Sequence, residues 1–373
     1  MEIKPIGIYI HVPFCKRKCN YCDFCSEAAS DDKISRYTDA LCNEIIEFSK
    51  ERKLNVDTVF FGGGTPSILD VASFEKIMNT VRECFDIVDG AEITVEVNPG
   101  TVTEEKACVF AKCGVNRISI GVQSIHENEL RALGRIHNYA DFLNTVDIFR
   151  RVGIDNLSAD LMYGIPEQTV ASFTETLRDI TKLPLSHVSC YGLIVEEGTP
   201  FYLNRDKLSL PTEDEECEMY RLAHEMLTEA GFRHYEISNY AKDSCLSRHN
   251  LKYWRTEEYV GFGLSAHSYY GGKRFYNTSD FGEYFTCDST KYRMEESDTC
   301  GIDPFEYVML ALRTDDGFSL SEYERLFGRS FLSGREEKLR VLSSGGFLTM
   351  DDGVVRLTHE GFYVSNSILA DLL

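Results

Sequence analysis

Short apolar runs alternate with amphipathic segments through the first half of the chain. Six of the runs are rich in β-branched and aromatic residues and predict strands, over residues 7–12, 56–61, 92–97, 117–123, 156–163 and 187–195. Between them, apolar residues recur at the three- and four-residue spacing of helices, over residues 31–53, 71–85, a segment ending at 113, 127–133, 139–152 and 170–182. This alternation predicts an α/β fold with a parallel sheet and helices outside it.

The pattern loosens after residue 195. An acidic helix is predicted over 211–230, opened by a capping box of Thr212 and Glu215, whereas Asp31 and Asp32 are expected to cap the first helix. Residues 235–240 are strand-like, 247–270 are rich in aromatics, and 283–299 are polar and weakly periodic, which is typical of a linker.

A different pattern begins at Pro304. Short helices are predicted over 305–312, 321–327 and 336–344, then a hairpin of 347–350 and 354–357, and a last helix over 360–372. Helices followed by a small hairpin resemble a winged-helix-like α+β module. The module lacks a basic recognition face, so a packing role is favoured over DNA binding.

Composition and charge exclude some classes of binding partner and indicate the compartment. The 373 residues carry a net charge of −21, which repels phosphate and argues against nucleic acid and anionic membranes. No run reaches the ~20 apolar residues of a membrane helix, and the first residues do not resemble a signal peptide. Several of the 13 cysteines are scattered singly, among them Cys42, Cys84 and Cys190, which suits a reducing compartment. We therefore expect a cytoplasmic protein without an integral membrane segment.

Thiols and basic residues are concentrated directly after the first predicted strand. Cys15, Cys19 and Cys22 follow a C-x3-C-x2-C spacing, with three basic residues at 16–18. Thiolates on a short loop can converge on one iron–sulfur cluster. Three ligands leave one iron of a four-iron cluster free, and an open position is what a catalytic metal needs. The alternatives are a zinc site or free thiols, but zinc sites usually take four ligands in paired motifs, and no second pair follows.

Glycines and polar residues mark the ends of the later strands. Gly62 to Gly64, followed by Thr65 and Pro66, form a backbone that a ligand can approach closely. Four polar side chains lie within or just after strands three to five, namely Glu96, Gln123, Arg135 and Asp160. Carboxyl ends of strands are where α/β barrels place their sites. Singly each would be a structural residue, whereas together they predict a polar ligand.

At this point the chain resembles the coproporphyrinogen-oxidase-like branch of the radical S-adenosylmethionine (SAM) proteins. The resemblance rests on the cysteine loop, GGGTPS, ITVEVNP, RISIGVQS, SADLMYGIP and the C-terminal module. It implies a partial, TIM-like (β/α)6 barrel and a [4Fe-4S] cluster on the three cysteines, whose free iron binds SAM. It further implies SAM contacts at Tyr9, Tyr21, Gly63, Gly64, Thr65, Glu96, Gln123, Arg135 and Asp160.

The same resemblance suggests three domains. The radical SAM core is expected over 1–235, with the cluster loop at 12–26. A barrel extension follows at 236–290, and a cap domain like that of the oxidase (HemN-like) at 291–373.

Two kinds of protein share this branch, an oxygen-independent coproporphyrinogen III oxidase and heme chaperones. The oxidase has a further cysteine two positions after the third ligand, where this chain has Phe24. Cys25 is then a bystander thiol or a stray ligand. The oxidase also has an N-terminal extension, whereas Tyr9 lies near the start here. Finally, residues 247–254 resemble the HNxxYW motif of the chaperones.

That motif predicts a heme site. A neutral imidazole such as His249 can bind heme iron axially. Tyr253 and Trp254, the only tryptophan, offer flat apolar surface for a porphyrin. The alternative is that His249 is a hydrogen-bonded structural residue and the aromatics are core. Spacing alone favours the alternative, and the family resemblance reverses it.

The main hypothesis is a heme chaperone that hands heme to an apo-hemoprotein and carries a cluster and SAM in its barrel, without an assigned catalytic residue. The second is an enzyme of porphyrin biosynthesis that uses an electron donor to cleave SAM and decarboxylates coproporphyrinogen III. The third is a scaffold that holds a cluster without SAM, against which Glu96, Gln123, Arg135 and Asp160 argue.

Overall fold

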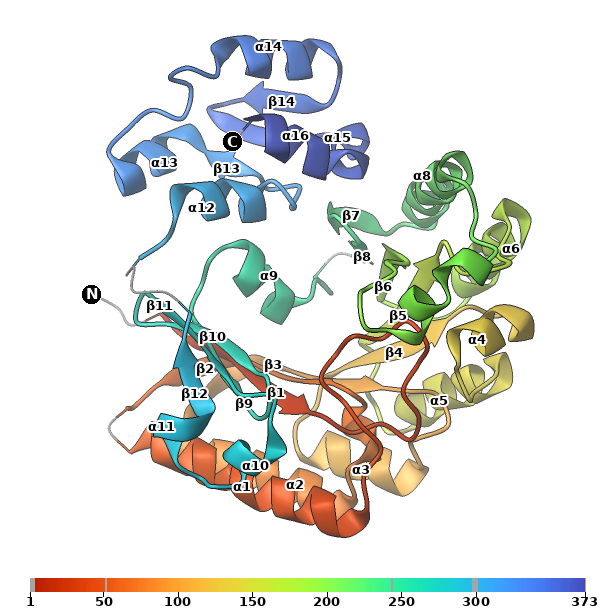
Figure 1. The fold of residues 1–373 in the computed structure, drawn as a ribbon, viewed down its shortest axis with the longest axis vertical. Coiled ribbons are helices and arrows are strands. Elements are labelled where there is room, and N and C mark those ends of the chain that lie inside the picture. Colours follow the sequence, from red (N-terminus) through yellow and green to blue (C-terminus); the bar gives the residue numbers. More distant parts are fainter. Residues whose placement is uncertain (1–3, 51, 243, 297–300, 373) are drawn as a thin grey trace.

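A computed structural model describes residues 4–50, 52–242, 244–296 and 301–372 (Figure 1). Its centre is a run of six parallel strands that neighbour one another in chain order. They are β1 (Ile6–Val12), β2 (Asn55–Gly63), β3 (Asp86–Val97), β4 (Arg117–Gln123), β5 (Leu157–Tyr163) and β6 (His187–Gly192). The predicted α/β fold with a partial barrel is thereby confirmed, although β3 starts earlier and β6 ends earlier than expected.

Helices cover the outer face of these strands. They are α1 (Asp31–Ser49), α2 (Val71–Cys84), α3 (Glu104–Lys112), α4 (Glu127–Leu133), α5 (Tyr139–Arg151) and α6 (Val170–Ile180), with a 3-10 turn at Pro66–Ile68. The main core lies between helices and sheet, and Phe74 and Phe110 pack at 4.4 Å between ring centroids. The side chain of Ser30 caps α1 by accepting from the amide of Lys33. The prediction that Asp31 and Asp32 cap this helix is wrong, because both lie within its first turn.

Both edges of the central run carry further strands. Beyond β6 lies β8 (Asn239–Ala241), antiparallel to β6, and then β7 (Arg233–Glu236), antiparallel to β8. One strand was predicted in this region. Beyond β1 lie the parallel β9 (Tyr259–Phe262) and the antiparallel β10 (His267–Tyr270), β11 (Lys273–Asn277) and β12 (Arg293–Glu295).

The polar linker predicted over 283–299 is mostly ordered structure. It contains the end of α10 (Phe281–Tyr284), α11 (Ser289–Tyr292) and β12, whereas 297–299 lie outside the described residues. The anchor is the buried carboxylate of Glu44, which accepts from the hydroxyl of Tyr284 at 2.7 Å and from Arg293 at 3.0 Å. These anchors are single residues in polar sequence, so periodicity misses them.

One short helix connects the two strands, β8 and β9, that flank the central run. This helix is α9 (Arg248–Trp254), between β8 and β9. Earlier in the chain lie α7 (Pro200–Leu203), a 3-10 turn at Arg205–Lys207 and α8 (Glu213–Glu229). The predicted capping box of α8 is confirmed. The first amides of α9 donate to the buried carboxylate of Glu92 on β3, both at 3.0 Å. Lys252 pairs with Asp57 near the start of β2 at 2.9 Å. Helix α9 therefore lies across the amino ends of the central strands and forms a floor beneath them.

The C-terminal domain has its own hydrophobic core and lies on the α9 side of the sheet (Figure 1). It comprises α12 (Pro304–Ala311), β13 (Phe318–Ser319), α13 (Leu320–Phe327), α14 (Glu336–Ser344), β14 (Leu348–Asp351), β15 (Val354–Leu357), α15 (His359–Tyr363) and α16 (Ser365–Leu372). The three strands form an antiparallel sheet in the order β13-β15-β14. The predicted last helix is two helices, because the chain leaves helical geometry at Val364 (φ −103°, ψ 20°).

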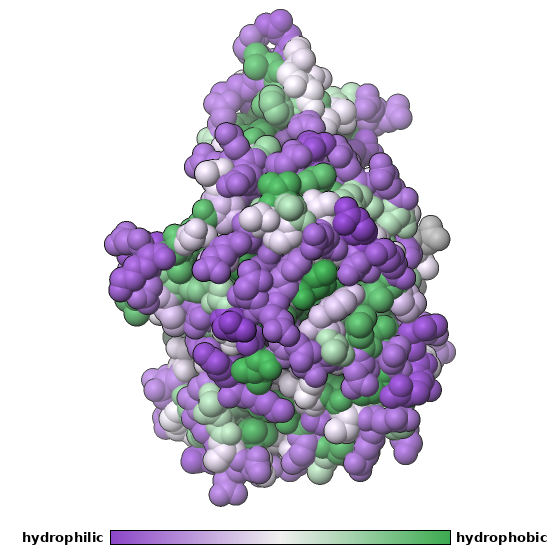
Figure 2. Space-filling view, turned by 90° about the vertical axis from the view of Figure 1, so that its right-hand side faces the viewer, coloured by the Kyte–Doolittle hydropathy of each residue, from purple (hydrophilic) through white to green (hydrophobic). Residues whose placement is uncertain are grey.

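The surface agrees with the acidic composition. Hydrophilic residues cover most of the face in Figure 2, with hydrophobic residues in separate groups between them. Within the part of the chain that the structure describes, none of the helices has both the length and the apolar character needed to span a bilayer.

Candidate functional site

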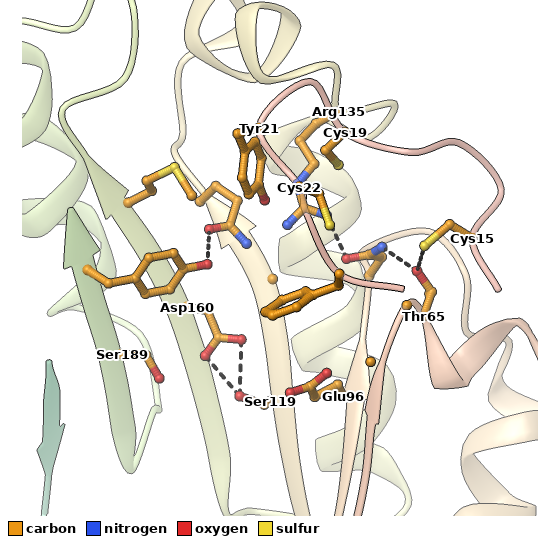
Figure 3. Close-up of a pocket in the computed structure, with 18 of the residues that line it drawn as sticks. Cys15, Cys19, Tyr21, Cys22, Thr65, Glu96, Ser119, Arg135, Asp160 and Ser189 are labelled. Atoms are coloured by element: carbon orange, nitrogen blue, oxygen red, sulfur yellow. Dashed lines mark hydrogen bonds between the residues drawn. The ribbon is translucent and has the colours of Figure 1, made fainter. Parts of the chain in front are cut away.

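A cavity of about 570 Å³ opens at the carboxyl ends of the central strands. Figure 3 shows the three cysteines of the loop in its upper part and Glu96, Ser119 and Asp160 in its lower part. The structure brings together in its walls Cys15, Cys19, Tyr21, Cys22, Gly63, Gly64, Thr65, Glu96, Gln123, Arg135 and Asp160. Tyr9 is not among the lining residues, although it lies on the same face of the sheet as Phe60, on which its ring stacks; its hydroxyl lies 3.0 Å from the Nδ1 of His11.

Backbone hydrogen bonds hold the cysteine loop over this cavity. The amide of Cys15 donates to Glu27 at 2.9 Å, and the amide of Asn20 donates to Leu133 at 2.9 Å. The hydroxyl of Thr65 lies 3.4 Å from the sulfur of Cys15. Three thiols that line one cavity from a single fixed loop are a donor set that suits an iron–sulfur cluster.

Cys25 is separated from the other three thiols. It does not line the first cavity but a second, neighbouring one, and its carbonyl accepts from His11 at 2.9 Å. This position agrees with the interpretation of Cys25 as a bystander.

The glycine run is constrained by the protein itself. Gly63 has φ +106°, and a Cβ there would lie 2.5 Å from the ring of His11. A Cβ on Gly64 would lie 2.7 Å from the carbonyl oxygen of Phe14. Close packing of β2 against β1 and the cysteine loop therefore requires glycine at both positions, in addition to any approach of a ligand.

Charged groups are buried in the cavity walls. Burial, and then the charge of Asp160, raises the pKa of Glu96 to about 8. The carboxylate of Asp160 accepts from the hydroxyl of Ser119 at 2.8 Å. Arg135 donates to Asn98 at 2.7 Å, yet its buried Nε, like that of Arg117, has no hydrogen-bond partner among the described residues. Buried charges without full partners fit a polar ligand in this cavity.

Several lining residues escaped the sequence analysis. Asn98 joins Thr65 and Arg135, at 2.9 and 2.7 Å, and its signal was the strand-ending Asn98-Pro99-Gly100 turn. The hydroxyl of Tyr191 on β6 donates to Gln123 at 2.8 Å. Gln123 itself has φ +64°, an uncommon conformation for a residue with a side chain, at a register shift in β4. Backbone strain of this kind is concentrated at functional sites, and no sequence pattern reports it.

The HNxxYW stretch is part of the floor. His249 is 0% exposed, and its two ring nitrogens lie 2.8 Å from the hydroxyls of Thr58 and Tyr253. Its ring stacks on Phe60, and burial lowers its pKa to about 3. These contacts agree with the alternative of a hydrogen-bonded structural histidine, and heme ligation by His249 stays a prediction. Trp254 points elsewhere, with the guanidinium of Arg313 at 5.8 Å from its ring.

The second cavity, of about 680 Å³, lies beside the cluster loop and shares Lys18, Asp23 and Phe24 with the first. Aromatic side chains, one lysine and two histidines share its walls, which include Tyr9, His11, Lys18, Phe24, Tyr253, Tyr259 and His267. Phe24 is 63% exposed, and the exposed His267 stacks on Tyr276 with 5.2 Å between centroids. Tyr253 is the one member of the predicted heme triad in this wall.

Comparison with known proteins agrees with this geometry. Residues 9–180 match the family model of the radical SAM superfamily, and residues 303–364 match that of the HemN C-terminal domain. The fold and the cysteine site define a radical SAM protein, and that family implies SAM and a [4Fe-4S] cluster, which the donor set fits. The fold is also that of the coproporphyrinogen III oxidase HemN from Escherichia coli, with a TM-score of 0.84 and 22% identity over 99% of this chain and 90% of that one.

Curated relatives refine the family. The chain is 34% identical to the heme chaperone HemW of Bacillus subtilis, with 98% of each protein covered. It is 33% identical to the heme chaperone HemW of Lactococcus lactis, over 99% of this chain and 98% of the relative. The chain therefore belongs to the HemW family of heme chaperones. The family predicted from the motifs is confirmed, and the relatives favour the chaperone hypothesis over the oxidase.

Proposed function

We propose that this protein is a cytoplasmic heme chaperone that binds heme and hands it to an apo-hemoprotein. The observation that carries the proposal is the match to heme chaperones over nearly the whole chain. Phe24 also supports a chaperone rather than the oxidase, because it stands where the oxidase has a further cysteine.

The barrel cavity is proposed to hold the cluster and SAM. Cys15, Cys19 and Cys22 would bind three irons, and the remaining iron would be open to SAM. Gly63, Gly64 and Thr65 offer backbone and hydroxyl contacts on one wall, and Gln123 offers its amide. Arg135 can donate to a carboxylate, while Glu96 and Asp160 can accept from ammonium or hydroxyl groups. Tyr21 provides an aromatic face. A bound cluster would supply electrons for SAM chemistry, with a separate donor if SAM is cleaved.

Heme is proposed to bind in the second cavity, with His267 as its axial ligand. A volume of about 680 Å³ lies in the range of small-molecule sites. The walls offer flat aromatic surface in Tyr253 and Tyr259 and a cation, Lys18, for a propionate. Ligation by His249 instead would require its bonds to Thr58 and Tyr253 to open and its ring to leave the floor. His267 is exposed and needs no such change.

Heme titration of the reconstituted protein tests this assignment. Binding can be followed by absorbance and by quenching of Trp254, the only tryptophan. His267→Ala should lower heme affinity at least about tenfold, or ~1.4 kcal/mol. His126→Ala, whose ring bonds to the carbonyl of Ser172 away from both cavities, is the matched control and should bind as the wild type does.

The same titration separates the two candidate histidines. His249→Phe, provided that it folds, should retain the affinity of the wild type. Loss of heme in His249→Phe with retention in His267→Ala would transfer the ligand to the HNxxYW motif. Absence of saturable heme binding in the wild type would refute the chaperone proposal. Rapid SAM-dependent decarboxylation of coproporphyrinogen III would then identify the enzyme.

A further inference from the structure

Three histidines from distant parts of the chain meet beside the C-terminal domain. His224 lies on α8, His234 on β7 and His359 at the start of α15. One potential ligand atom from each lies within 4.8 Å of the others, the one group of this kind among the described residues. None of the three lines either cavity described above.

Hydrogen bonding brings one ring nitrogen of His224 and one of His234 together. The Nε2 of His234 faces the carbonyl of Ile237 at 3.4 Å, and a carbonyl only accepts, so this nitrogen carries the proton. The Nδ1 of His234 is then an acceptor, and the Nδ1 of His224 donates to it at 3.1 Å; a metal ion bound here replaces this proton, which moves to the other ring nitrogen of His224. The Nδ1 of His359 is buried and has no partner among the described residues.

We propose that His224, His234 and His359 bind one Zn²⁺ ion. Three imidazole nitrogens form a typical zinc donor set, with Zn–N distances of about 2.0–2.1 Å and a fourth position for water. A backbone carbonyl that fixes the tautomer of a ligand, as Ile237 does for His234, is the usual support of such sites. To coordinate, the ring of His359 turns out of its stack on His224, now 3.6 Å between centroids, and loses no hydrogen bond in doing so.

The surroundings favour a cation bound by neutral histidines. Burial lowers the pKa of His234 to about 3 and that of His359 to about 4, so neither is protonated at neutral pH. The carboxylates of Glu225 and Glu360 lie close enough to act on His224. Heme iron does not suit the site, because a porphyrin occupies four positions of the metal and leaves too few for three converging imidazoles.

The ion would join the C-terminal domain to the end of the segment expected as the radical SAM core. His224 and His234 lie on α8 and β7 of that segment, and His359 lies in the C-terminal domain. The two parts already share several contacts: Tyr220 stacks on His359 at 5.2 Å, Arg233 pairs with Asp315 at 2.7 Å, and the amide of Ile237 donates to the carbonyl of Arg313 at 2.9 Å. A bridging ion adds a bond that both partners must break before they separate.

Zinc titration of the full-length protein tests the proposal. The cluster is first reconstituted and iron content verified, so that the loop thiols are occupied. Calorimetry should then show that the cluster-loaded protein binds one equivalent of Zn²⁺, and Zn²⁺ should raise its melting temperature. His359→Ala and, independently, His224→Gln should weaken Zn²⁺ binding at least about tenfold and remove the thermal shift. His126→Ala should behave as the wild type does.

X-ray absorption at the zinc edge gives a readout that stability does not affect. The expected first shell is three imidazole nitrogens and one oxygen. A sulfur-rich shell, equal zinc binding in all four proteins, or no additional equivalent in the wild type would overturn the site. Because the cysteines and both cavities are untouched, none of these results bears on the heme proposal.

Discussion

The barrel cavity and the α9 floor both bury charged and ionisable groups, but they treat them in opposite ways. In the floor, the carboxylate of Glu92 accepts hydrogen bonds from two backbone amides, Lys252 pairs with Asp57, and both ring nitrogens of His249 are hydrogen-bonded. In the cavity, the pKa of Glu96 is raised to about 8, which favours its protonated form, and the Nε of Arg135 has no hydrogen-bond partner among the described residues. Within the same described part of the chain, the floor also holds unpartnered polar atoms, the Oγ of Ser247 and the Nε1 of Trp254, but these are neutral groups. Buried charges that have partners stabilise a fold, whereas a buried charge with an open donor fits a ligand, so the difference favours the cavity as a binding site.

The largest expected effect is loss of the cluster. Cys19→Ala removes one of three ligands from the cavity, and the reconstituted variant should lose the visible absorption and the iron of the cluster. Cys25→Ala changes a thiol outside this cavity and should retain both. Cluster loss in Cys25→Ala would show that the loop uses a fourth thiol and would leave no iron open to SAM.

Next comes the stability of the floor. His249→Ala removes a buried ring and leaves the hydroxyls of Thr58 and Tyr253 without their partner, so it should cost ~2–4 kcal/mol in free energy of unfolding. Denaturant unfolding measures this. The control His267→Ala, at an exposed position, should cost less than ~0.5 kcal/mol. Equal, small losses in both variants would mean that the floor does not depend on His249.

Acid should weaken the floor by a somewhat smaller amount. The pKa of His249 is about 3 in the folded protein, below its ordinary value of 6.5, so the unfolded chain binds the proton more tightly. Stability due to His249 is therefore complete above pH 6.5 and falls as the pH drops toward 3, by ~2 kcal/mol at pH 5. His249→Phe should have a correspondingly shallower dependence of unfolding free energy on pH. Parallel curves for the two proteins would contradict the buried, neutral state.

The smallest effect concerns SAM and pH. Glu96, with a pKa of about 8, is mostly protonated at pH 7, and a cationic ligand favours the carboxylate. SAM binding should therefore release a proton and weaken as the pH falls below 8, by at most about tenfold per unit. Calorimetry in buffers of different ionisation enthalpy detects the proton. Glu96→Gln should abolish the release, and release that persists in this variant would assign the proton to another group.

The sequence predicted the strands of the barrel, because each is a compact apolar run bounded by turn residues. It also predicted the lining of the cavity, because the carboxyl ends of parallel strands meet at one edge. It did not predict the strained Gln123, the role of Asn98 or the environment of His249, since these depend on contacts between segments distant in the chain. For His249, the hydrogen-bond partners on β2 and α9 are visible only in the structure, and its role in heme binding stays a prediction.

The position of β1 has a consequence for how the chain is made. Gly7 pairs with Thr58 on one side and with Tyr259 on the other. During synthesis, β1 therefore remains an open sheet edge until most of the protein has left the ribosome, and open edges promote association with other chains. Contacts this distant in sequence also slow folding. The cysteine loop follows β1 directly, so it leaves the ribosome well before the residues of the α9 floor.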